Sequence, residues 1–251
     1  MLRKLLLGAA LSAAAFTPAL AQTVPSWSWA GPYAGLNIGY GFGNETYNYQ
    51  GSYDAAGTQP AYGSFNHDVR GVTGGAQIGY NFQAPGGFVL GVETDLDKTN
   101  TGFNEAYFGN DGAGANYTGR IQAQLDYLGT VRARIGLPMM GGRVLPYLTG
   151  GLAYGRVEGS SSFNCPSCAA GEGGSFNAAS EQVGWTAGGG VEYPISRQLS
   201  VKVEYLYARF GHQGLNTPDG GFGGPGASVY NASANQQLDD NVVRVGLNYH
   251  F

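Results

Sequence analysis

The chain has 251 residues, of which 44 are glycine, 13% are aromatic and only 12% are charged. Soluble domains average about 7% glycine and 25% charged residues. The composition excludes an ordinary helical enzyme, because glycine and aromatic residues are poor helix formers and few charges remain for helix surfaces. The aromatic content argues against a disordered chain. The length suits one all-β domain built from strands and turns.

Residues 1–21 have the features of a secretory signal peptide. Arg3 and Lys4 supply a positive start, an apolar stretch follows, and a small-x-small site predicts cleavage between Ala21 and Gln22. A short membrane anchor is the alternative, but the apolar stretch is too short to span a bilayer as a helix. The sequence therefore predicts an exported protein.

Removal of the signal peptide leaves 11 basic and 17 acidic residues, a net charge of about −6. Lys98 and Lys202 are then the only lysines. Without a basic patch, electrostatic binding to phosphate backbones is disfavoured, so we expect no nucleic-acid partner. We divide the mature chain into an N-terminal lead-in, residues 22–30, and one domain, residues 31–251.

Apolar and polar residues alternate along most of the mature chain, and this period of two predicts β-strands. The segment 143–158 is ambiguous, because residues 145–148 are apolar on both faces. A soluble sandwich also alternates in this way, so alternation alone does not identify a membrane barrel. The eight predicted strands are residues 31–44, 68–82, 87–98, 121–137, 143–158, 181–194, 199–212 and 239–251.

The lengths of the connections favour a barrel over a sandwich. Long gaps of 22 to 26 residues alternate strictly with short gaps of 4 or 5 residues. This alternation is typical of an eight-stranded antiparallel up-and-down transmembrane β-barrel with four long extracellular loops and three short periplasmic turns. The long gaps are 45–67, 99–120, 159–180 and 213–238, and the short gaps are 83–86, 138–142 and 195–198.

The long gaps are rich in Gly, Asn, Ser and Tyr, so we expect loops there rather than a second domain. In the barrel, the apolar face of each strand meets lipid, and tyrosines near the strand ends form interfacial girdles.

The opposite face of the predicted strands carries most of the charged residues. The interior of an eight-stranded barrel is only wide enough for side chains to fill, so these groups are expected to pair in a lumen charge network. A narrow ion path is the alternative. The inward charged residues are Glu93, Asp95, Asp97, Asp126, Arg132, Arg134, Glu192, Lys202, Glu204 and Arg244.

Several short motifs follow one another in order across nearly the whole mature chain. Together they resemble the small surface-antigen porins of the outer-membrane β-barrel family, which are related to opacity proteins and to the membrane domain of OmpA-type proteins. The resemblance implies an abundant outer-membrane protein of a Gram-negative cell with an envelope-structural or porin-like role and antigenic loops. The motifs are WAGPYAG at 29–35, GGAQIGYN at 74–81, GVETD at 91–95, GTVRARIG at 129–136, PYLTGGLAYG at 146–155 and NYHF at 248–251.

The chain ends in an alternating apolar strand with a terminal aromatic residue. The alternative is a strand that simply stops there, but the resemblance implies an assembly signal for the barrel-insertion machinery. Other expected partners are outer-membrane lipid and lipopolysaccharide, and the oligomeric state is left open. The residues of the predicted assembly signal are Val243, Val245, Leu247, Tyr249 and Phe251.

Two cysteines lie in the third long gap. Cys165 and Cys168 lack the strand-to-helix setting of a redox site and the two further ligands of a zinc site. In an oxidising exported compartment, a local disulfide between them is the better hypothesis.

The three histidines, His67, His212 and His250, form no metal-binding or catalytic motif, so we expect neither cofactor nor catalysis. A haem-binding or catalytic role for His67, with Tyr62 nearby, remains an alternative.

The sequence thus predicts a structural or narrow porin-like barrel. A binding module that acts through its long loops, in adhesion or haem capture, is the second hypothesis. A lipid A-modifying enzyme is more remote, because the His-x-Ser arrangement that resembles such deacylases is absent: Val69 and Gly214 stand two residues after His67 and His212.

Overall fold

The computed structural model describes residues 27–52, 60–110, 116–165, 172–211, 213–217 and 230–251. The predicted signal peptide, its cleavage site and Cys168 lie outside these residues. In the described part of the chain, no helix is long and apolar enough to cross a membrane. Its regular secondary structure is entirely β, as the composition predicted.

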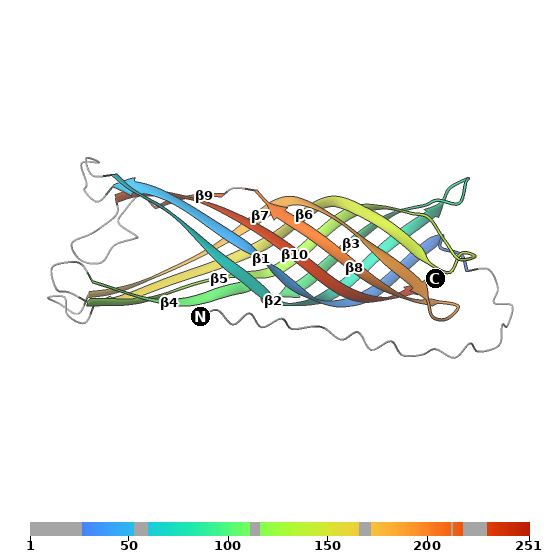
Figure 1. Cartoon of the computed structure of the whole chain (residues 1–251), viewed down its shortest axis with the longest axis horizontal. Helices are drawn as coiled ribbons and strands as arrows, with labels where there is room; N and C mark the ends of the chain where they lie inside the picture. Colours follow the sequence, from blue (N-terminus) through green and yellow to red (C-terminus); the bar gives the residue numbers. More distant parts are fainter. Residues whose placement is uncertain (1–26, 53–59, 111–115, 166–171, 212, 218–229) are drawn as a thin grey trace, which may run out of the picture.

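The strands form one closed antiparallel ring (Figure 1). Its order is β1–β10–β8–β7–β6–β5–β3–β2, and pairing between β1 and β2 closes it. β4 follows β3 along the same part of the wall, and β9 follows β8 in the same way, so the ten strands occupy eight positions around the ring. The predicted eight-stranded barrel is confirmed. The strands are β1 (Gly31–Ser52), β2 (Pro60–Gln83), β3 (Val89–Thr99), β4 (Gly102–Asn110), β5 (Asn116–Gly136), β6 (Leu145–Cys165), β7 (Glu172–Pro194), β8 (Leu199–Phe210), β9 (Gln213–Thr217) and β10 (Tyr230–His250).

The two ends of the barrel differ. Tight connections join β2 to β3, β5 to β6 and β7 to β8 at one end of the barrel, which we call the turn end. β1 starts at this end and β10 finishes there. In the first of these turns, Gly86 and Gly87 have φ angles of 95° and 87°, which residues with a side chain rarely adopt. We call the opposite end the hairpin end (Figure 1).

The strands extend much further toward the hairpin end than predicted. β1 and β2 remain paired as far as Ser52 and Pro60, and β6 and β7 as far as Cys165 and Glu172. The prediction of long loops was therefore wrong for much of 45–67, 99–120 and 159–180. Polar sequence was interpreted as loop, but the backbone hydrogen bonds that pair these strands do not require apolar alternation.

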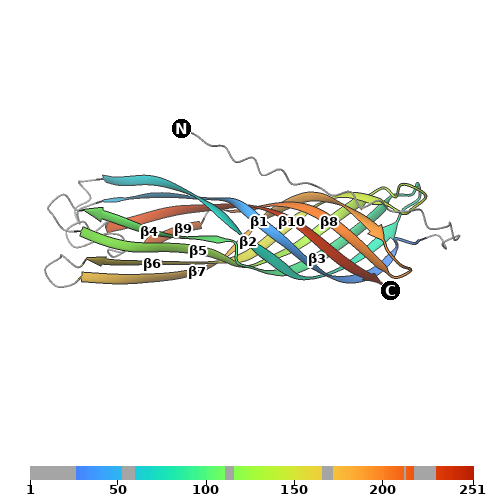
Figure 2. The ribbon, with the colours of Figure 1, turned by 60° about the horizontal axis from the view of Figure 1, so that its bottom comes forward.

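At the hairpin end the described strands form two sheets, which lie apart in Figure 1 and partly overlap in the turned view of Figure 2. β2 and β4 pair only at Arg70 and Gly102, and the β7–β8 ladder ends at Gly184 and Phe210. Beyond these points, the described strands form a β9–β10–β1–β2 sheet and a β4–β5–β6–β7 sheet. The wall is therefore continuous around the closed barrel and split above it.

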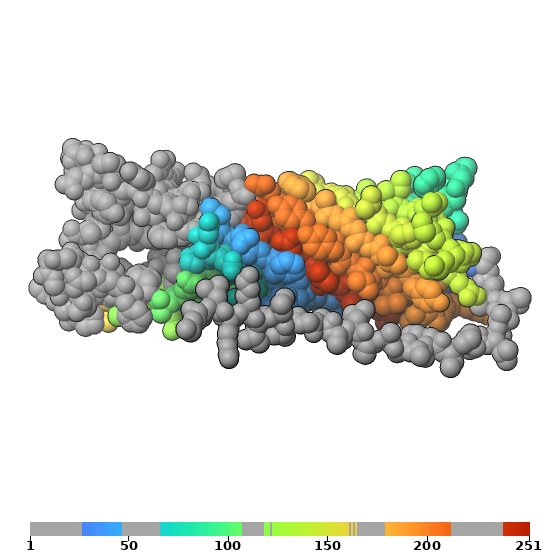
Figure 3. All heavy atoms as spheres, viewed as in Figure 1, coloured from blue at the N-terminus to red at the C-terminus, as the bar shows by residue number. Residues whose placement is uncertain are grey.

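The distribution of side chains in the closed barrel is the reverse of that in a soluble protein. Outward positions carry large apolar side chains, such as Leu36 at 68% exposure, whereas inward positions include buried arginines, carboxylates and a lysine. Figure 3 shows the outer surface of β1, β10 and β8 as continuous and without a hollow. The core of this protein is its lumen.

Candidate functional site

A compact network of charged side chains fills the middle of the lumen. The side chains come from alternate residues of five strands, because a period of two turns every second residue inward. All are at least nine-tenths buried. They are Glu93, Asp95 and Asp97 of β3, Arg132 and Arg134 of β5, Glu192 of β7, Lys202 and Glu204 of β8, and Arg244 of β10.

Two arginines lie at the centre of the network and share carboxylates. Arg132 reaches Asp95 Oδ2 at 2.8 Å and Glu204 Oε1 at 3.0 Å, and also pairs with Glu93. Arg244 reaches the same Asp95 oxygen at 2.9 Å and Glu204 Oε2 at 2.6 Å. Its second terminal nitrogen contacts Asp97 at 2.7 Å. These pairs join β3, β5, β8 and β10 across the lumen.

The rest of the network lies nearer the turn end. Lys202 Nζ donates to both oxygens of Glu93 at 2.9 Å, and the Tyr33 hydroxyl donates to Glu93 at 2.7 Å. Arg134 donates to Tyr33 at 3.0 Å and to Glu192 at 2.7 Å. Each buried charge therefore has opposite charges or hydrogen-bonding groups around it, as burial requires.

Asp126 does not belong to this network, although alternation placed it there. The β5–β6 register shifts between Leu125 and Tyr127, so Asp126 sits at a β-bulge, where the inward and outward positions of β5 exchange. Its carboxylate pairs with the exposed Lys98 instead. The assignment of Asp126 to the lumen was wrong, because no sequence feature marked the bulge.

An apolar layer lies on the hairpin side of the network. Along β8, the inward positions change from Lys202 and Glu204 to Leu206, Ala208 and Phe210. Their neighbours make this layer continuous between strands. The buried cluster is Val69, Leu125, Leu128, Ala153, Val157, Leu206, Ala208, Phe210, Leu238 and Val242, with Phe103 against it.

The N-terminal lead-in covers the turn end of the lumen. Trp29 is 1% exposed and packs with Val89 and Leu145, and Trp27 packs against this cluster. The Trp29 indole N–H donates to the carbonyl oxygen of Gly142 at 2.8 Å. No sequence pattern had predicted a role for this segment, although the aromatic pair Trp27 and Trp29 just before β1 was a signal for it.

Ser200, His250 and Glu192 meet beneath this aromatic cover. The Ser200 hydroxyl lies 3.0 Å from His250 Nε2 and donates to Glu192 at 2.5 Å. In a catalytic triad the acid holds the other nitrogen of the histidine, but no described residue hydrogen-bonds to His250 Nδ1. All three side chains are also buried. The cluster therefore lacks the arrangement and the access of a nucleophilic site.

His67 lies on β2 at the hairpin end. Its ring stacks on Phe103 with centroids 4.1 Å apart, and its Nδ1 is 3.4 Å from a carboxylate oxygen of Glu105. These contacts bridge β2 and β4 just above their last backbone pair. His212 lies outside the described residues, and nothing is described of the Tyr62 side chain. Among the described residues, no group of three or more His, Cys, Asp or Glu side chains is arranged to hold a metal ion.

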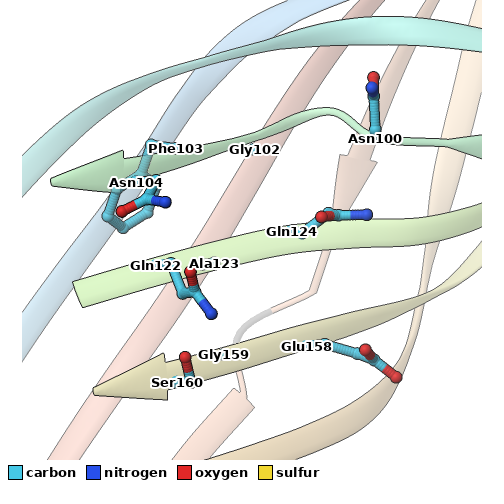
Figure 4. A pocket seen from close by; sticks show the side chains of 10 residues that line it. All are labelled: Asn100, Gly102, Phe103, Asn104, Gln122, Ala123, Gln124, Glu158, Gly159 and Ser160. Carbon is cyan, nitrogen blue, oxygen red and sulfur yellow. The ribbon is translucent and has the colours of Figure 1, made fainter. Parts of the chain in front are cut away.

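A polar pocket of about 320 Å³ lies across β4, β5 and β6 near the hairpin end (Figure 4). It is on the outer face, because Gln122 and Gln124 are exposed whereas Ala123 between them is buried. Amide and hydroxyl groups and one carboxylate can accept and donate hydrogen bonds there. Its lining residues are Asn100, Gly102, Phe103, Asn104, Gln122, Ala123, Gln124, Glu158, Gly159 and Ser160.

The residues of the predicted assembly signal form the outward face of β10 and the chain end. Val243, Val245, Leu247 and Tyr249 are exposed, and the ring of Phe251 stands edge-on to Tyr249 with centroids 5.1 Å apart. They continue the apolar band that surrounds the whole barrel. Such a band above tight turns is the lipid-facing surface of a transmembrane barrel.

Comparison with known proteins agrees with this geometry. The family model described as "Outer membrane protein beta-barrel domain" matches residues 5–251. The chain is 35% identical to the 31 kDa outer-membrane immunogenic protein of Brucella melitensis, over 92% of this chain and 87% of that protein. It is 27% identical to a 22 kDa outer membrane protein of Rhizobium leguminosarum, over 92% of this chain and 82% of that protein.

Among solved structures, the outer membrane protein OprG of Pseudomonas aeruginosa matches with a TM-score of 0.45 and 11% identity, over 90% of this chain and 98% of that chain. The family match and the relatives place the protein in the outer membrane of a Gram-negative cell. Bacterial outer-membrane barrels have their short turns on the periplasmic side, and we assign the turn end to that side by this rule. The chain belongs to the outer membrane protein β-barrel family.

Proposed function

We propose that the protein is a closed envelope-structural barrel that does not conduct ions. The observation that carries this proposal is the filled lumen. Charged groups paired across the bore lie between an apolar layer on the extracellular side and the Trp27–Trp29 cover on the periplasmic side. An ion that crossed this lumen would need to pass both apolar layers and separate pairs such as Arg132–Glu204.

Opening the lumen is energetically expensive. Removing one partner of a buried ion pair costs about 3–5 kcal/mol, because the remaining charge stays buried without compensation. Several such pairs share the Asp95 Oδ2 atom or the two oxygens of the Glu204 carboxylate, so opening one pair disturbs the others. This coupling favours a closed barrel over the narrow pore that the sequence left open.

Single-channel recording tests the proposal. The refolded mature protein in a planar bilayer is expected to give no discrete conductance steps over a wide range of voltages. The comparison is a variant with Arg132→Ala, Glu204→Ala, Leu206→Ala and Trp29→Ala, which removes side chains from the network and from both apolar layers and is expected to leak. Regular steps from the unmodified protein would support the porin-like role instead.

A second candidate function is ligand binding at the extracellular end. The pocket on β4, β5 and β6 supports it, because cross-strand rows Gly102–Gln124–Glu158 and Asn104–Gln122–Ser160 present hydrogen-bonding groups around a position without a side chain. Amides with a single carboxylate suit a neutral polyhydroxylated ligand such as a saccharide, on a host surface or on lipopolysaccharide.

Calorimetry with neutral oligosaccharides tests this candidate. Binding that is lost in the Gln122→Ala, Gln124→Ala double variant but kept in Gln198→Ala, at the turn end, would establish the pocket as the site. Equal heats in both variants, or none in the unmodified protein, would exclude it.

Haem capture remains a narrower form of the binding hypothesis. Glu105 beside Nδ1 orients the His67 ring, and an oriented imidazole is a suitable axial ligand. Haem titration of the protein and of His67→Ala, followed by the Soret absorbance, tests it: equal spectra would remove His67 from any haem site. We propose no catalytic role.

We also propose that the outward face of β10 is the signal by which the barrel-insertion machinery recognises the chain, and that outer-membrane lipid and lipopolysaccharide surround the apolar band. The exposure of Val243, Val245, Leu247 and Tyr249 on one face supports this proposal. The disulfide between Cys165 and Cys168 stays a prediction from the sequence.

A further inference from the structure

Asp240 is an acid placed inside the apolar layer of the lumen. It is 1% exposed, and Leu238 and Val242, two residues away on the same face of β10, both belong to the apolar cluster. In the ladders, Asp240 stands opposite Ala208 of β8 on one side and Gly43 of β1 on the other. Its surroundings are therefore unlike those of the acids in the charge network.

The carboxyl group of Asp240 has no charged side-chain partner of the kind that the network acids have, and the backbone N–H of Asn241 is the hydrogen-bonding group beside it. Its Oδ1 is buried and accepts no hydrogen bond from any described residue. Thr101 is a polar side chain close to it: a Cβ placed on Gly41 would lie 2.6 Å from the Thr101 hydroxyl and 3.1 Å from Asp240 Oδ1. Gly41 thus provides the space in which these two side chains approach each other.

Among the described residues, no charged group forms an ion pair with Asp240. Arg244, four residues along β10, is bound to Asp97 and to other network carboxylates. The inward positions of β8 opposite Asp240 are uncharged. On the extracellular side, Glu45 of β1 is a second buried acid and His67 of β2 faces Glu105.

Asp240 lies where the barrel wall divides. It belongs to the β9–β10–β1–β2 sheet, whereas Thr101 leads directly into β4 of the other sheet. The last backbone pair between β2 and β4 is at Gly102, the next residue after Thr101. The Asp240–Thr101 approach therefore spans the junction of the two sheets, on the lumen side.

We propose that Asp240 is a proton-dependent latch between the two extracellular sheets. With its proton in place, the neutral carboxyl group lies in the apolar layer beside Thr101 and closes the extracellular end of the lumen. When the proton leaves to water, the buried carboxylate requires hydration, and the apolar layer opens to admit it.

The environment sets the direction of the pH dependence. Asp239 and Asn241 face outward with polar side chains, so Asp240 lies beyond the lipid-facing band; there, burial raises its pKa from 3.8 to about 7. A raised acid pKa means that the closed state holds more protons than the open state. Stability of the closed layer is therefore greatest below about pH 3.8, falls as the pH rises between 3.8 and about 7, and changes little above that.

Hydrogen exchange of the refolded full-length barrel in detergent micelles tests the latch. Amide exchange in the peptide containing Leu238–Val242, corrected for the intrinsic effect of pH, is measured at pH 5.5 and pH 8.5. Protection is expected to fall about tenfold or more at the higher pH. Asp240→Asn keeps the shape of the side chain without a titratable proton, so its protection is expected to be equal at both pH values.

Asp239→Asn is the matched control, because it removes an adjacent carboxylate that faces outward, and it is expected to retain the pH dependence. Asp240→Ser gives a second, smaller variant with the same expected loss, in case Asp240→Asn fails to refold. Equal protection of the unmodified protein at both pH values, or pH dependence that survives both Asp240 substitutions, would overturn the proposal.

Discussion

Trp29 and Gly142 are joined by a hydrogen bond across 113 positions of the chain, from the indole N–H to a turn carbonyl at 2.8 Å. The bond fixes the N-terminal lead-in over the periplasmic turn between β5 and β6. Because Trp29 is also packed with Val89 and Leu145, this segment is an integral part of the barrel.

Trp29→Ala is expected to destabilise the barrel by about 3–5 kcal/mol, since it empties a buried aromatic position. The measurement is the urea midpoint for unfolding of the protein in micelles. Trp185→Ala is the control, because Trp185 is half exposed on the outer face and its loss leaves no internal cavity. Equal urea midpoints for the two variants would mean that the packing of Trp29 does not stabilise the periplasmic end of the barrel.

Arg132→Met is expected to cost about 3–5 kcal/mol, because Glu93, Asp95 and Glu204 then share one fewer buried cation. The same urea titration measures it. Lys98→Met breaks an ion pair whose lysine is mostly exposed, and it is expected to cost at most about 1 kcal/mol. An Arg132→Met variant with the same urea midpoint as the unmodified protein would argue against a network that stabilises the fold.

Gly79→Val is expected to displace Tyr33 from the lumen. A Cβ at Gly79 would lie 2.3 Å from the Tyr33 ring, so the ring must move and its hydrogen bond to Glu93 is lost. Overpacking of this kind costs about 1–3 kcal/mol. Gly150→Val is the control, since the nearest atom to its added Cβ is 3.5 Å away. Thermal unfolding of both variants, followed by gel mobility, distinguishes them.

Removal of Phe251 is expected to reduce the amount of protein assembled in the outer membrane of cells, with little effect on refolding in detergent. Phe251 is 76% exposed, so its side chain contributes little to internal packing. Phe251→Tyr is expected to assemble normally. Cell fractionation and heat-modifiable gel mobility measure assembly, and normal insertion of the truncated chain would contradict the proposed assembly signal.

The sequence alone was enough to predict the barrel and the two faces of its wall. A period of two decides which side chains lie together, and the alternation of short and long gaps decides that all tight turns lie at one end. For this reason Glu93, Arg132 and Arg244 were assigned to the interior before their partners were known. The low charge content follows from the same arrangement, because lipid is the solvent of the outer face.

Only the tertiary structure decided where the strands end and which charges meet. The parts of the strands near the hairpin end carry no apolar alternation, so their polar residues were interpreted as loops. The bulge at Asp126 reversed the faces locally, and its cause lies in pairing with β6. Closure of the ring brought Trp29 over the turn after β5, and it placed Asp240 among apolar side chains of other strands. These relationships depend on register between distant segments, which local sequence patterns do not contain.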